Sequence, residues 1–563
     1  MCCAGADGTP HAGLLGVLGP SGSGKSTLLT LLAGHAPPPP GGTIELNGHT
    51  LEKSTAARIG FVPQTDSLFP FLTVRETLEI GGRLRGLSAT VAFERASAAL
   101  EQMRLSAVEH CRVGEASLLP QRGISGGERK RLSLALETVR DVDALVLDEP
   151  SSGLDAHSTL ELLRALAAIA SSRAVLCSLH QPSAKAWAQV SQTLLLDARG
   201  RTIYFGASKD ANRHFDACGH PMPPLCNAAE HFLDLALEET PLPAPKPVLP
   251  RMVMLPLTPL HQPPFLALLG TLFGRASKQN CRNPAFLRVL LSRSATMAPV
   301  IAWLFSQAHV LTQRGVQDRT GALFFLLTTQ IMSSSSSMRT FLSERAIVEH
   351  EQRASLYGVL PYFLARSFAE SYLHLGAASL FALLCHLLLG LASPLGAFVA
   401  VVALVTLVAE SYVIALGSLL TNEKVAAVIS SLLLALQMAA GGFFANSASA
   451  APVQRALNTV NMYKYGFAAL VQLEFDGLRF DCTPAELIGS LPPARWQRRL
   501  LSVMRVTVAE QRCPVVSGEQ VVEQLHLDDM TATQNVLALG LLVVGYRFVA
   551  YLALRRRFRS PLC

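Results

Sequence analysis

The residues best suited to chemistry form a glycine-rich segment near the start of the chain, Gly19-Pro-Ser-Gly-Ser-Gly-Lys25-Ser26-Thr27. It follows an apolar stretch at 14–18 and precedes a predicted helix over 28–33, which is the setting that the pattern G-x-x-x-x-G-K-S requires. Such glycines let backbone N–H groups curl around phosphates, and the start of a helix attracts anions. We therefore expect Lys25 to neutralise the β- and γ-phosphates of a nucleotide and Ser26 to bind Mg²⁺. The predicted phosphate-binding residues are Gly19, Ser21, Gly22, Ser23, Gly24, Lys25, Ser26 and Thr27.

Two adjacent carboxylates end a second predicted strand. The apolar run at 144–147 leads directly into Asp148-Glu149-Pro150. If this strand is parallel to the one at 14–18, Asp148 lies where a nucleotide-bound Mg²⁺ needs a ligand. Glu149 is then placed to polarise the attacking water as a general base. Two acids at a strand end are ordinarily only solvated, but the phosphate-binding loop favours the catalytic interpretation.

Three more polar positions fit the same site. Ser125 precedes Gly126-Gly127 at the predicted start of a helix, where free N–H groups can bind an anion without a lysine. Gln64 follows a predicted strand and is expected to reach the metal and the water. His180 ends another predicted strand and is expected to contact the γ-phosphate. Each signal is weak alone, because a strand-end histidine is usually structural and Ser-Gly-Gly occurs in many loops.

Composition places these motifs in a chain with a membrane part. Of 563 residues, 50% are hydrophobic and 16% are charged, which excludes disorder, collagen and a small disulfide scaffold. The net charge of +7 is no argument for nucleic acid, since cationic flanks of membrane spans also explain it. Residues 1–237 alternate apolar strands and helices, as in an α/β domain, and the proline-rich stretch 238–265 predicts an extended linker. Residues 265–280 predict an amphipathic helix on the cytosolic membrane surface.

Residues 266–563 predict an all-α transmembrane domain, because a membrane-crossing helix needs about 20 apolar residues. We expect six spans, at about 294–312, 320–338, 366–390, 396–420, 425–445 and 533–554. Arginines at 555–557 and 559 follow the last span, so the positive-inside rule and the even number of spans put both ends in the cytosol. The long loop 446–532 is then external. Only Cys482 and Cys513 face the oxidising side, which makes them a candidate disulfide, with free or intermolecular thiols as the alternative.

In this order, the motifs resemble the nucleotide-binding domain of an ABC transporter. Gly19–Thr27 corresponds to Walker A, Gln64 to the Q-loop, Ser125–Glu128 to the signature, Asp148-Glu149 to Walker B, residues 152–155 to the D-loop and His180 to the H-loop. The resemblance implies an ABC-type P-loop fold, ATP and Mg²⁺ as cofactors, and two such domains that meet head to tail. It implies catalytic roles for Glu149, His180 and Gln64, metal contacts for Ser26, Gln64 and Asp148, and nucleotide contacts across the dimer for Ser125, Gly126, Gly127 and Asp155.

An ATPase domain followed by six spans resembles the G (White) subfamily of half-transporters over nearly the whole chain. The strings that carry this resemblance are 60–78, 319–366, 441–444, 462–467, 513–518 and 545–548. One departure is the short stretch before Gly19, because no Tyr, Trp or Phe precedes Phe61 and the family stacks an aromatic residue on adenine. We expect a truncated N-terminus, since a missing strand would leave a sheet edge exposed; the alternative is adenine bound without stacking.

The resemblance implies an ATP-hydrolysing half-transporter that forms a homodimer or a heterodimer and exports an amphipathic or lipid-like molecule. A xenobiotic efflux pump and a membrane-anchored regulator are the alternatives, while six spans exclude a soluble ABC ATPase and the signature disfavours a P-loop GTPase. The expected partners are a second half-transporter, membrane lipid and a hydrophobic small molecule, without nucleic acid. The plasma membrane and an internal membrane are both compatible with the sequence, and the substrate is open.

By the same resemblance, spans two and five line a substrate path on the dimer axis. Residues at helical spacing on these spans would face it: Phe325, Thr329, Met332, Ser431, Ala435 and Met438. Phe443 and Phe444 would form an apolar plug below the external loop, although packing between helices or against lipid is the alternative for the whole set. The resemblance also predicts that the charged loop 341–361 holds a coupling helix docked on the ATPase domain, with a merely solvated loop as the alternative. Glu410, inside the fourth span, is expected to make a structural hydrogen bond between helices, with contact to a substrate or a proton as the alternative.

Overall fold

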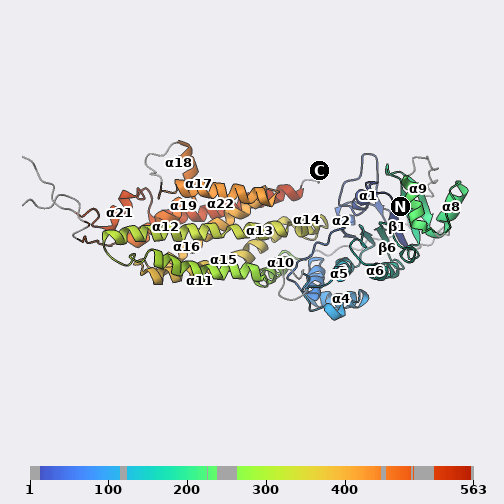
Figure 1. The fold of residues 1–563 in the computed structure, drawn as a ribbon, viewed down its shortest axis with the longest axis horizontal. Coiled ribbons are helices and arrows are strands. Elements are labelled where there is room, and N and C mark those ends of the chain that lie inside the picture. The colour runs from blue at the N-terminus through green and yellow to red at the C-terminus, as the bar shows by residue number, and fades with distance from the viewer. Residues whose placement is uncertain are drawn as a thin grey trace, which may run out of the picture. The chain divides into compact units, whose positions relative to one another are not determined.

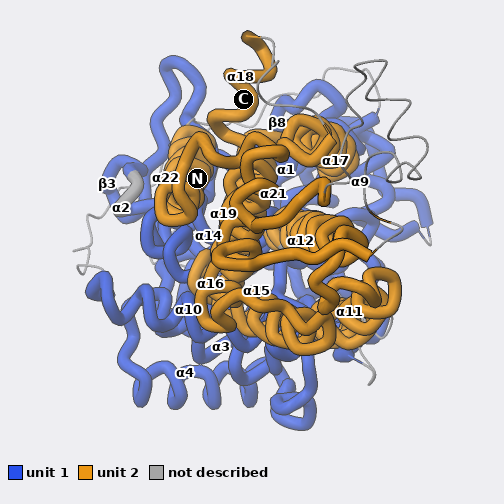
Figure 2. The backbone as a smooth tube through the Cα atoms, turned by 90° about the vertical axis from the view of Figure 1, so that its left-hand side faces the viewer, with its two compact units in different colours: residues 1–282, 345–365, 558–563 blue, residues 283–344, 366–557 orange. Residues whose placement is uncertain are grey.

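The computed structural model describes residues 13–114, 123–224, 226–237, 263–444, 452–483, 486 and 513–559. The chain forms two compact units, which Figure 2 colours separately. Unit 1 comprises residues 1–282, 345–365 and 558–563, and unit 2 comprises 283–344 and 366–557. Residues 1–12, which belong to the short stretch before Gly19, and most of the expected linker, 238–262, lie outside the described residues.

Unit 1 is built on a six-stranded mixed sheet in the order β4-β5-β6-β1-β7-β8. Neighbouring strands are parallel except for β8, which runs antiparallel to β7. The strands are β1 (Leu14–Leu18), β4 (Ile59–Val62), β5 (Ala144–Leu147), β6 (Ala174–Ser178), β7 (Gln192–Leu196) and β8 (Thr202–Ala207). A two-stranded sheet pairs β2 (Glu45–Leu46) with β3 (His49–Thr50). The central strands are buried along their whole length because both faces of the sheet are covered, which explains their continuous apolar sequence.

Helices surround this sheet in unit 1. They are α1 (Lys25–Leu32), α2 (Lys53–Ala56), α3 (Val74–Leu84), α4 (Ala89–Gln102), α5 (Gly126–Thr138), α6 (Ala156–Ile169), α7 (Ala184–Trp187), α8 (Ala211–Ala217), α9 (Ala228–Leu237), α10 (Phe265–Cys281) and α14 (Arg345–Arg353), with short 3₁₀ turns at Ser106–Val108 and Ser208–Asp210. Several of these helices begin at a side-chain cap that can be recognised in the sequence. Thr73 and Glu76 form a reciprocal capping box at α3, and Ser125 and Glu128 form another at α5. The α/β fold predicted for this region is confirmed.

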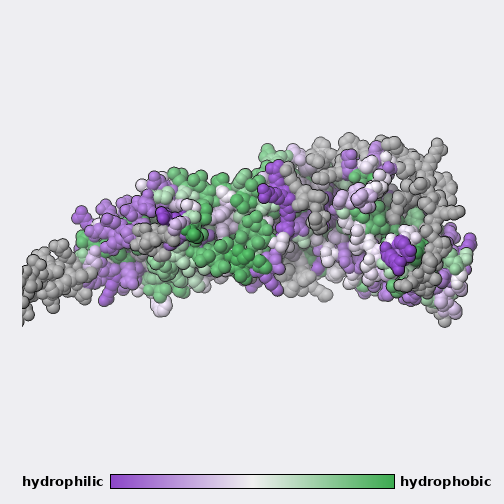
Figure 3. Space-filling view, turned by 90° about the horizontal axis from the view of Figure 1, so that it is seen from above, coloured by the Kyte–Doolittle hydropathy of each residue, from purple (hydrophilic) through white to green (hydrophobic). Residues whose placement is uncertain are grey.

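Unit 2 is helical. Its elements are α11 (Pro284–Leu304), α12 (Gln313–Ser333), α13 (Ser335–Ser343), α15 (Val359–Leu389), α16 (Leu395–Leu419), α17 (Glu423–Ala440), α18 (Pro452–Asn458), α19 (Met462–Phe475), α21 (Gly518–Gln524) and α22 (Ala532–Arg559). The long helices run alongside one another in Figure 1. Their outward surface carries exposed apolar side chains, such as Val428, Leu541 and Phe548, and Figure 3 shows hydrophobic residues gathered over these helices. The all-α half of the predicted fold class is confirmed.

Five of the described helices are long and apolar enough to cross a membrane: α11, α15, α16, α17 and α22. The second expected span, 320–338, behaves differently because it is divided between α12 and α13. The first turns of α12 contain Asp318 and Arg319, and its last turn leads into a serine-rich segment, so its apolar stretch is short. Arg319 is nevertheless buried, where it pairs with Glu474 of α19 at 3.4 Å between Nη1 and Oε1.

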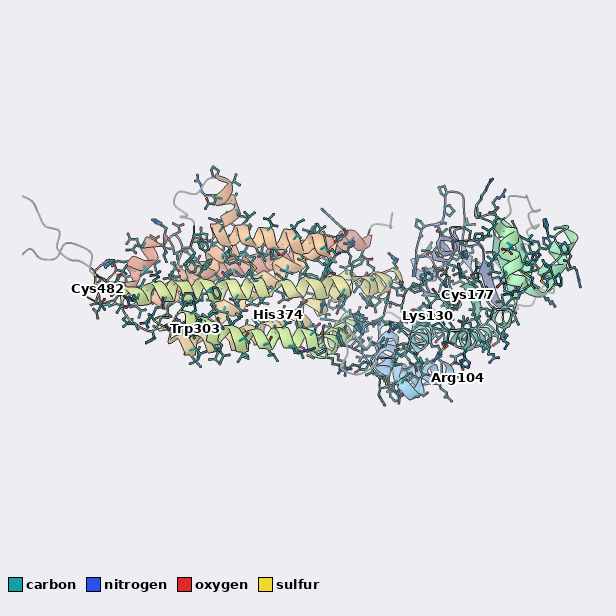
Figure 4. All side chains as sticks on the ribbon, in the orientation of Figure 1. Arg104, Lys130, Cys177, Trp303, His374 and Cys482 are labelled. Carbon is teal, nitrogen blue, oxygen red and sulfur yellow. A yellow bond between two sulfur atoms is a disulfide. The ribbon has the colours of Figure 1, made fainter. Side chains whose placement is uncertain are left out.

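The expected external loop, 446–532, contains more structure than a loop. Helix α19 within it is buried in the apolar core of unit 2, where Tyr463 and Phe467 are fully enclosed. Cys482 and Cys513, the candidate pair, are joined by a disulfide in the structure. Figure 4 places Cys482 at the end of unit 2 where α12 begins, which agrees with the hydrogen bond from the Asp481 N–H to the Leu311 carbonyl at 2.9 Å.

Glu410 lies within α16 and is completely buried. Its Oε1 accepts a hydrogen bond from Ser371 Oγ at 2.9 Å and lies 3.7 Å from Nη2 of Arg547, which belongs to α22. The same guanidinium donates to Ser371 and Ser411, so one arginine joins α15, α16 and α22. A buried carboxylate needs such partners, because an unpaired charge in this environment is costly. These contacts have the interhelical character expected from the sequence.

Candidate nucleotide-binding site

The carboxyl ends of parallel strands bring the motif residues to one edge of the sheet. Gly19 follows β1, Gln64 follows β4, Asp148 follows β5, and His180 follows β6. These four strands are consecutive in the sheet and parallel, so their carboxyl ends meet at the same edge. In parallel α/β sheets, ligands bind outside these ends.

The glycine-rich loop has a backbone shape that depends on glycine. Gly24, which immediately precedes α1, has φ +88, a left-handed conformation that other residues rarely adopt. A Cβ on Gly19 would lie 2.7 Å from Ser23 Oγ and 2.8 Å from the Leu196 carbonyl oxygen, so this position is closed to any side chain. Among the residues that the structure describes, no side chain caps the start of α1. The first N–H groups of the helix are therefore left for a ligand, as in anion sites at helix N-termini.

Lys25 is folded back onto this loop. Its Nζ donates to the carbonyl oxygens of Gly19 at 2.8 Å and Pro20 at 2.9 Å, and the residue is only 6% exposed. Burial lowers the pKa of the Lys25 ammonium, and the nearby carboxylates of Glu149 and Asp148 oppose this change. Within the described residues, the buried Oγ of Ser23 has no hydrogen-bond partner. An ammonium group, an unpartnered hydroxyl and an uncapped helix start together fit the phosphate chain of a nucleotide.

Gln64 and Glu149, predicted from separate motifs, are in direct contact. Gln64 Nε2 donates to Glu149 Oε2 at 2.8 Å. Glu149 has φ +43, which is uncommon for a residue other than glycine, and its N–H donates to Ser178 Oγ at 2.7 Å. The Ser178 hydroxyl in turn donates to Asp148 Oδ1 at 2.8 Å. The two carboxylates are therefore held in defined positions, with Asp148 buried and Glu149 partly exposed.

Lys130 fixes the backbone on the other side of Gln64. Its Nζ donates to the carbonyl oxygens of Pro63 at 3.2 Å and Gln64 at 2.8 Å and contacts Asp66 Oδ1 at 3.2 Å. The residue is 3% exposed and lies on α5, one turn after the signature motif. The sequence motifs do not predict a role for Lys130 or Ser178. Their proximity to motif residues was visible in the sequence, but their partners follow only from the fold.

The remaining predicted residues are fully or partly exposed, and Ser125 and Asp155 bond near neighbours in the sequence. Ser125 and Gly126 are exposed at the start of α5, where Glu128 Oε2 accepts from the Ser125 N–H at 2.7 Å. Asp155 caps α6, where its carboxylate accepts from the Ser158 N–H at 2.9 Å. The hydrogen bonds from the backbone N–H and the side chain of Ser158 lower the pKa of Asp155. His180 is exposed just beyond β6. Within one chain, the signature and the D-loop are thus left accessible on the surface.

Unit 1 also contains the predicted coupling segment. Helix α14 packs with α10, where Arg275 Nη1 and Nη2 donate to the two carboxylate oxygens of Glu351 at 2.5 and 2.9 Å. The Arg275 guanidinium carbon lies 4.4 Å from the centroid of the Phe69 ring, and Tyr357 donates its hydroxyl hydrogen to Glu351. Burial, the largest single effect, lowers the pKa of Arg275. The proximity of Glu351 and Tyr357 outweighs it, so that the pKa is raised above its ordinary value. This bidentate, buried pair holds α14 against α10.

A second ion-pair cluster fixes α10 to α3. Arg282 donates two hydrogen bonds to Glu76, at 2.5 and 2.9 Å, and Lys278 Nζ donates to the same carboxylate at 2.9 Å. Burial alone would raise the pKa of Glu76, but the hydrogen bonds from Arg282 and Lys278 outweigh it and lower the pKa to about 2. Helix α10 was expected at a membrane surface. Its inner face, which includes Leu272, is buried, and both α10 and α14 group with unit 1.

Two histidines meet where α14 approaches the end of α1. The ring centroids of His35 and His350 are 6.1 Å apart, and both rings lie beside Phe61 of β4. Burial lowers the pKa of His35 to about 4, an effect reinforced by His350 and Arg353 and opposed by Glu137. Burial likewise lowers the pKa of His350. Both rings are therefore neutral at pH 7 and above.

Acidification is expected to loosen this contact. Because the folded pKa of His35 lies below the unfolded value of about 6.5, the unfolded chain binds more protons, and stability present at pH 8 is lost as pH falls from 6.5 towards 4. His35 alone should cost about 2 kcal/mol of unfolding free energy at pH 5. Thermal unfolding between pH 8 and pH 5 should show a falling midpoint, and the decline should be shallower in His35→Gln. Equal pH profiles for the two proteins would contradict this assignment.

Comparison with known protein families identifies two matching regions. Residues 9–152 match the ABC transporter model, and residues 267–475 match the ABC-2 type transporter model. ABC transporter G family member 25 of Arabidopsis thaliana is 29% identical, with 96% of this chain and 85% of that protein aligned. ABC transporter G family member 22 of the same plant is 31% identical over 77% of this chain and 65% of its own length. Protein white of Drosophila melanogaster is 29% identical over 97% of this chain and 82% of its own length.

Both matched regions fit the geometry described above. The first contains the glycine-rich loop, Gln64 and the Asp148-Glu149 pair, and the second contains α10 and most of the membrane-type helices. The relatives extend the similarity over nearly the whole chain in the same domain order. ATP binding and ATPase-coupled transport in a membrane protein follow from this combination. The chain belongs to the G (White) subfamily of ABC half-transporters.

Proposed function

We propose that unit 1 hydrolyses ATP with the groups at the carboxyl edge of its sheet and that unit 2 uses this energy to export an amphipathic or lipid-like molecule. The observation that carries the proposal is the contact between Gln64 and Glu149 at 2.8 Å, next to Asp148 and the Lys25 loop. A hydrolytic site needs a phosphate-binding loop, a metal-binding carboxylate and a base, and this edge offers all three.

Each side chain has a distinct part in this proposal. Lys25 leaves the carbonyl oxygens of its own loop and pairs with the β- and γ-phosphates, assisted by the N–H groups at the start of α1. Ser26 and Asp148 supply oxygens that fit Mg²⁺, with Gln64 as a further oxygen donor. Mg²⁺ would supply neutralisation of the charge that develops on the phosphates. Glu149 accepts the proton of the attacking water; Gln64 occupies its Oε2, so Oε1 remains for the water. His180 is placed to donate to the γ-phosphate.

Dimerisation follows from the accessibility of the second half-site. Ser125, Gly126 and Asp155 are exposed, so a second chain can bring its own copies to the Walker A loop. Both halves of the site are present in one sequence, which allows two active sites in a homodimer and does not exclude a heterodimer. The proposed partner is therefore a second half-transporter. Native mass measurement should find two chains per particle; a monomer with full ATPase activity would contradict the proposal.

The proposed substrate path lies on α12 and α17. Phe325 and Met332 are 40% and 37% exposed in the single chain, and Thr329, Ser431, Ala435 and Met438 complete the set. Phe324, adjacent to this face, is buried and stacks on Phe443 at 4.2 Å between ring centroids, and Phe444 meets the same ring edge-on. An outward face of aromatic and methionine side chains suits flat apolar ligands of varied shape and also suits a second subunit.

Bulky substitutions should obstruct this path. The Met332→Trp and Met438→Trp variants are expected to abolish transport, because two large rings would fill a cavity lined by both helices. Basal ATP hydrolysis and dimer assembly should survive, since neither residue belongs to the nucleotide site. Leu541→Trp, on the exposed surface of α22, is the matched control. If transport persists in both methionine variants, the path lies elsewhere and these residues face lipid or another helix.

Topology is proposed on the same basis. The arginines in the last turns of α22 favour a cytosolic C-terminus, and the disulfide between Cys482 and Cys513 favours an oxidising, external side for that end of unit 2. The ATPase unit then lies in the cytosol.

The substrate class can be tested by stimulation of hydrolysis. Purified protein in lipid nanodiscs should hydrolyse ATP faster when sterols, phospholipids or amphipathic drugs are added. A response to lipids alone favours lipid export, whereas a response to drugs alone favours the xenobiotic-efflux alternative. Turnover unaffected by every class would remove the support for export and favour a regulatory role.

A further inference from the structure

Ser178 occupies the strand that separates the phosphate-binding loop from the acidic pair. Strand β6 lies between β1 and β5, and Ser178 is in register with Val17, just before the glycine-rich loop. On the other side, Leu147 is in register with Cys177, so the next pair along the two strands is Asp148 and Ser178. Residues opposed in this way in neighbouring strands point to the same face of the sheet. The side chains of Asp148 and Ser178 are therefore brought together by the sheet itself.

One hydroxyl group joins both acidic residues. Ser178 Oγ donates to Asp148 Oδ1 at 2.8 Å and accepts from the Glu149 N–H at 2.7 Å. Serine has a single hydroxyl hydrogen and two lone pairs, so these two bonds use its hydrogen and one acceptor site. Ser178 is completely buried, which excludes water as a replacement from the bulk solvent. The orientation of the Asp148 carboxylate and the position of the Glu149 backbone consequently depend on the same atom.

The Glu149 backbone needs this support. With φ +43, Glu149 has a left-handed conformation that costs about 1–2 kcal/mol for a residue with a Cβ. The chain turns away from the sheet at this point, and Pro150 follows. The preceding N–H, that of Asp148, continues the sheet by donating to the Val62 carbonyl at 2.9 Å, whereas the Glu149 N–H leaves the ladder and finds Ser178. The Ser178 bond thus stabilises the turn that brings the Glu149 side chain to Gln64.

We propose that Ser178 is a positioning residue for ATP hydrolysis, which sets the metal-binding carboxylate of Asp148 and the general base Glu149 in one common arrangement. The inference rests on the roles proposed above for these two acids. Because the Ser178 hydroxyl donates to Oδ1 of Asp148, it fixes the orientation in which this carboxylate would meet a metal ion. Groups that orient metal ligands in this way typically change metal affinity or activity by about 10–100-fold when removed.

The test removes the hydroxyl and separates positioning from folding. Ser178→Ala is expected to lower kcat by about 10–100-fold while KM for ATP changes less than threefold, because the phosphate-binding loop is intact. Ser178→Cys, which offers only a weak hydrogen-bonding group, should have a kcat between those of the wild type and Ser178→Ala. The matched control is Thr193→Val: Thr193 is also completely buried, lies in β7 of the same sheet, and bonds Ser208 Oγ at 2.8 Å. Its loss should lower stability without changing kcat.

A second readout does not depend on turnover. In the non-hydrolysing Glu149→Gln background, binding of a fluorescent ATP analogue can be titrated with Mg²⁺. Adding Ser178→Ala should raise the Mg²⁺ concentration for half-maximal binding by about tenfold, whereas adding Thr193→Val should leave it unchanged. The inference is overturned if Ser178→Ala keeps wild-type kcat and Mg²⁺ dependence, or if its activity falls only in proportion to the folded fraction. Hydrolysis at the wild-type rate in Glu149→Gln alone would instead overturn the proposed function.

Discussion

Replacing Glu149 by glutamine is expected to lower ATP turnover by about 10²–10⁴-fold while ATP binding persists. Glutamine keeps the shape of the side chain and can still contact Gln64, but it cannot take a proton from water. Lys25 and the loop that holds it are unchanged, so the phosphates remain bound. Turnover is measured as phosphate release by the purified protein, and binding by retention of labelled nucleotide.

The control for this substitution is Glu101→Gln, on the exposed face of α4 and away from the sheet edge. It removes the same charge and should hydrolyse ATP at the wild-type rate. A Glu149→Gln protein that also turns over at this rate would show that another group acts as the base. Loss of nucleotide binding in the same variant would show that Glu149 acts in binding rather than in proton transfer.

Reversing the charge of Glu351 should abolish transport, because a lysine there would face Arg275. Arg275 is 5% exposed and donates to both oxygens of Glu351, and breaking such a buried pair costs about 3–5 kcal/mol. The contact between α14 and α10 would be lost. ATP binding at the Walker A loop should remain within threefold of the wild type, since neither residue lies in that loop. Transport and ATP binding are measured on the same reconstituted preparation.

Glu349 provides the matched control on the same helix. It lies two residues earlier in α14 and pairs with Arg345 one turn away, at 3.0 Å. Such an i,i+4 pair contributes about 0.3–0.5 kcal/mol, so Glu349→Lys should retain most transport. From the sequence alone, the two glutamates are equivalent charged residues of one loop. The structure distinguishes them by their ion-pair partners. Equal loss of transport in the two variants would contradict the importance of the pair between Arg275 and Glu351.

The residues of the nucleotide site were predictable because their chemistry depends on local patterns. The glycine-rich loop, Gln64 and the Asp148-Glu149 pair are each read from a few consecutive residues, and parallel strands bring such positions to one edge. Ser178 was not predictable in this way. A serine in an apolar strand carries no signal of its own, and its bonds to Asp148 and Glu149 depend on the register between β5 and β6.

For the helices, the limit of sequence-based prediction lies in their packing. Hydropathy finds apolar runs, but it does not specify which helix packs on which unit. Helix α10 is amphipathic, as a membrane-surface helix would be, and only the partners of Arg275 and Lys278 reveal that its inner face belongs to unit 1. Likewise, Arg319 interrupts the hydropathy of α12, although its guanidinium is paired with Glu474 inside the helical core. The packing of α10 and the burial of Arg319 therefore both depend on pairing between distant residues, which composition does not reveal.

The most direct test of the account is transport into sealed vesicles that contain the purified protein in inside-out orientation. With Mg²⁺ and ATP, a labelled amphipathic or lipid-like molecule selected by its stimulation of hydrolysis should accumulate over time. Vesicles with Glu149→Gln protein should bind ATP and show only the passive background. Equal accumulation by the two preparations, or accumulation that does not require ATP, would contradict ATP-driven export by this chain.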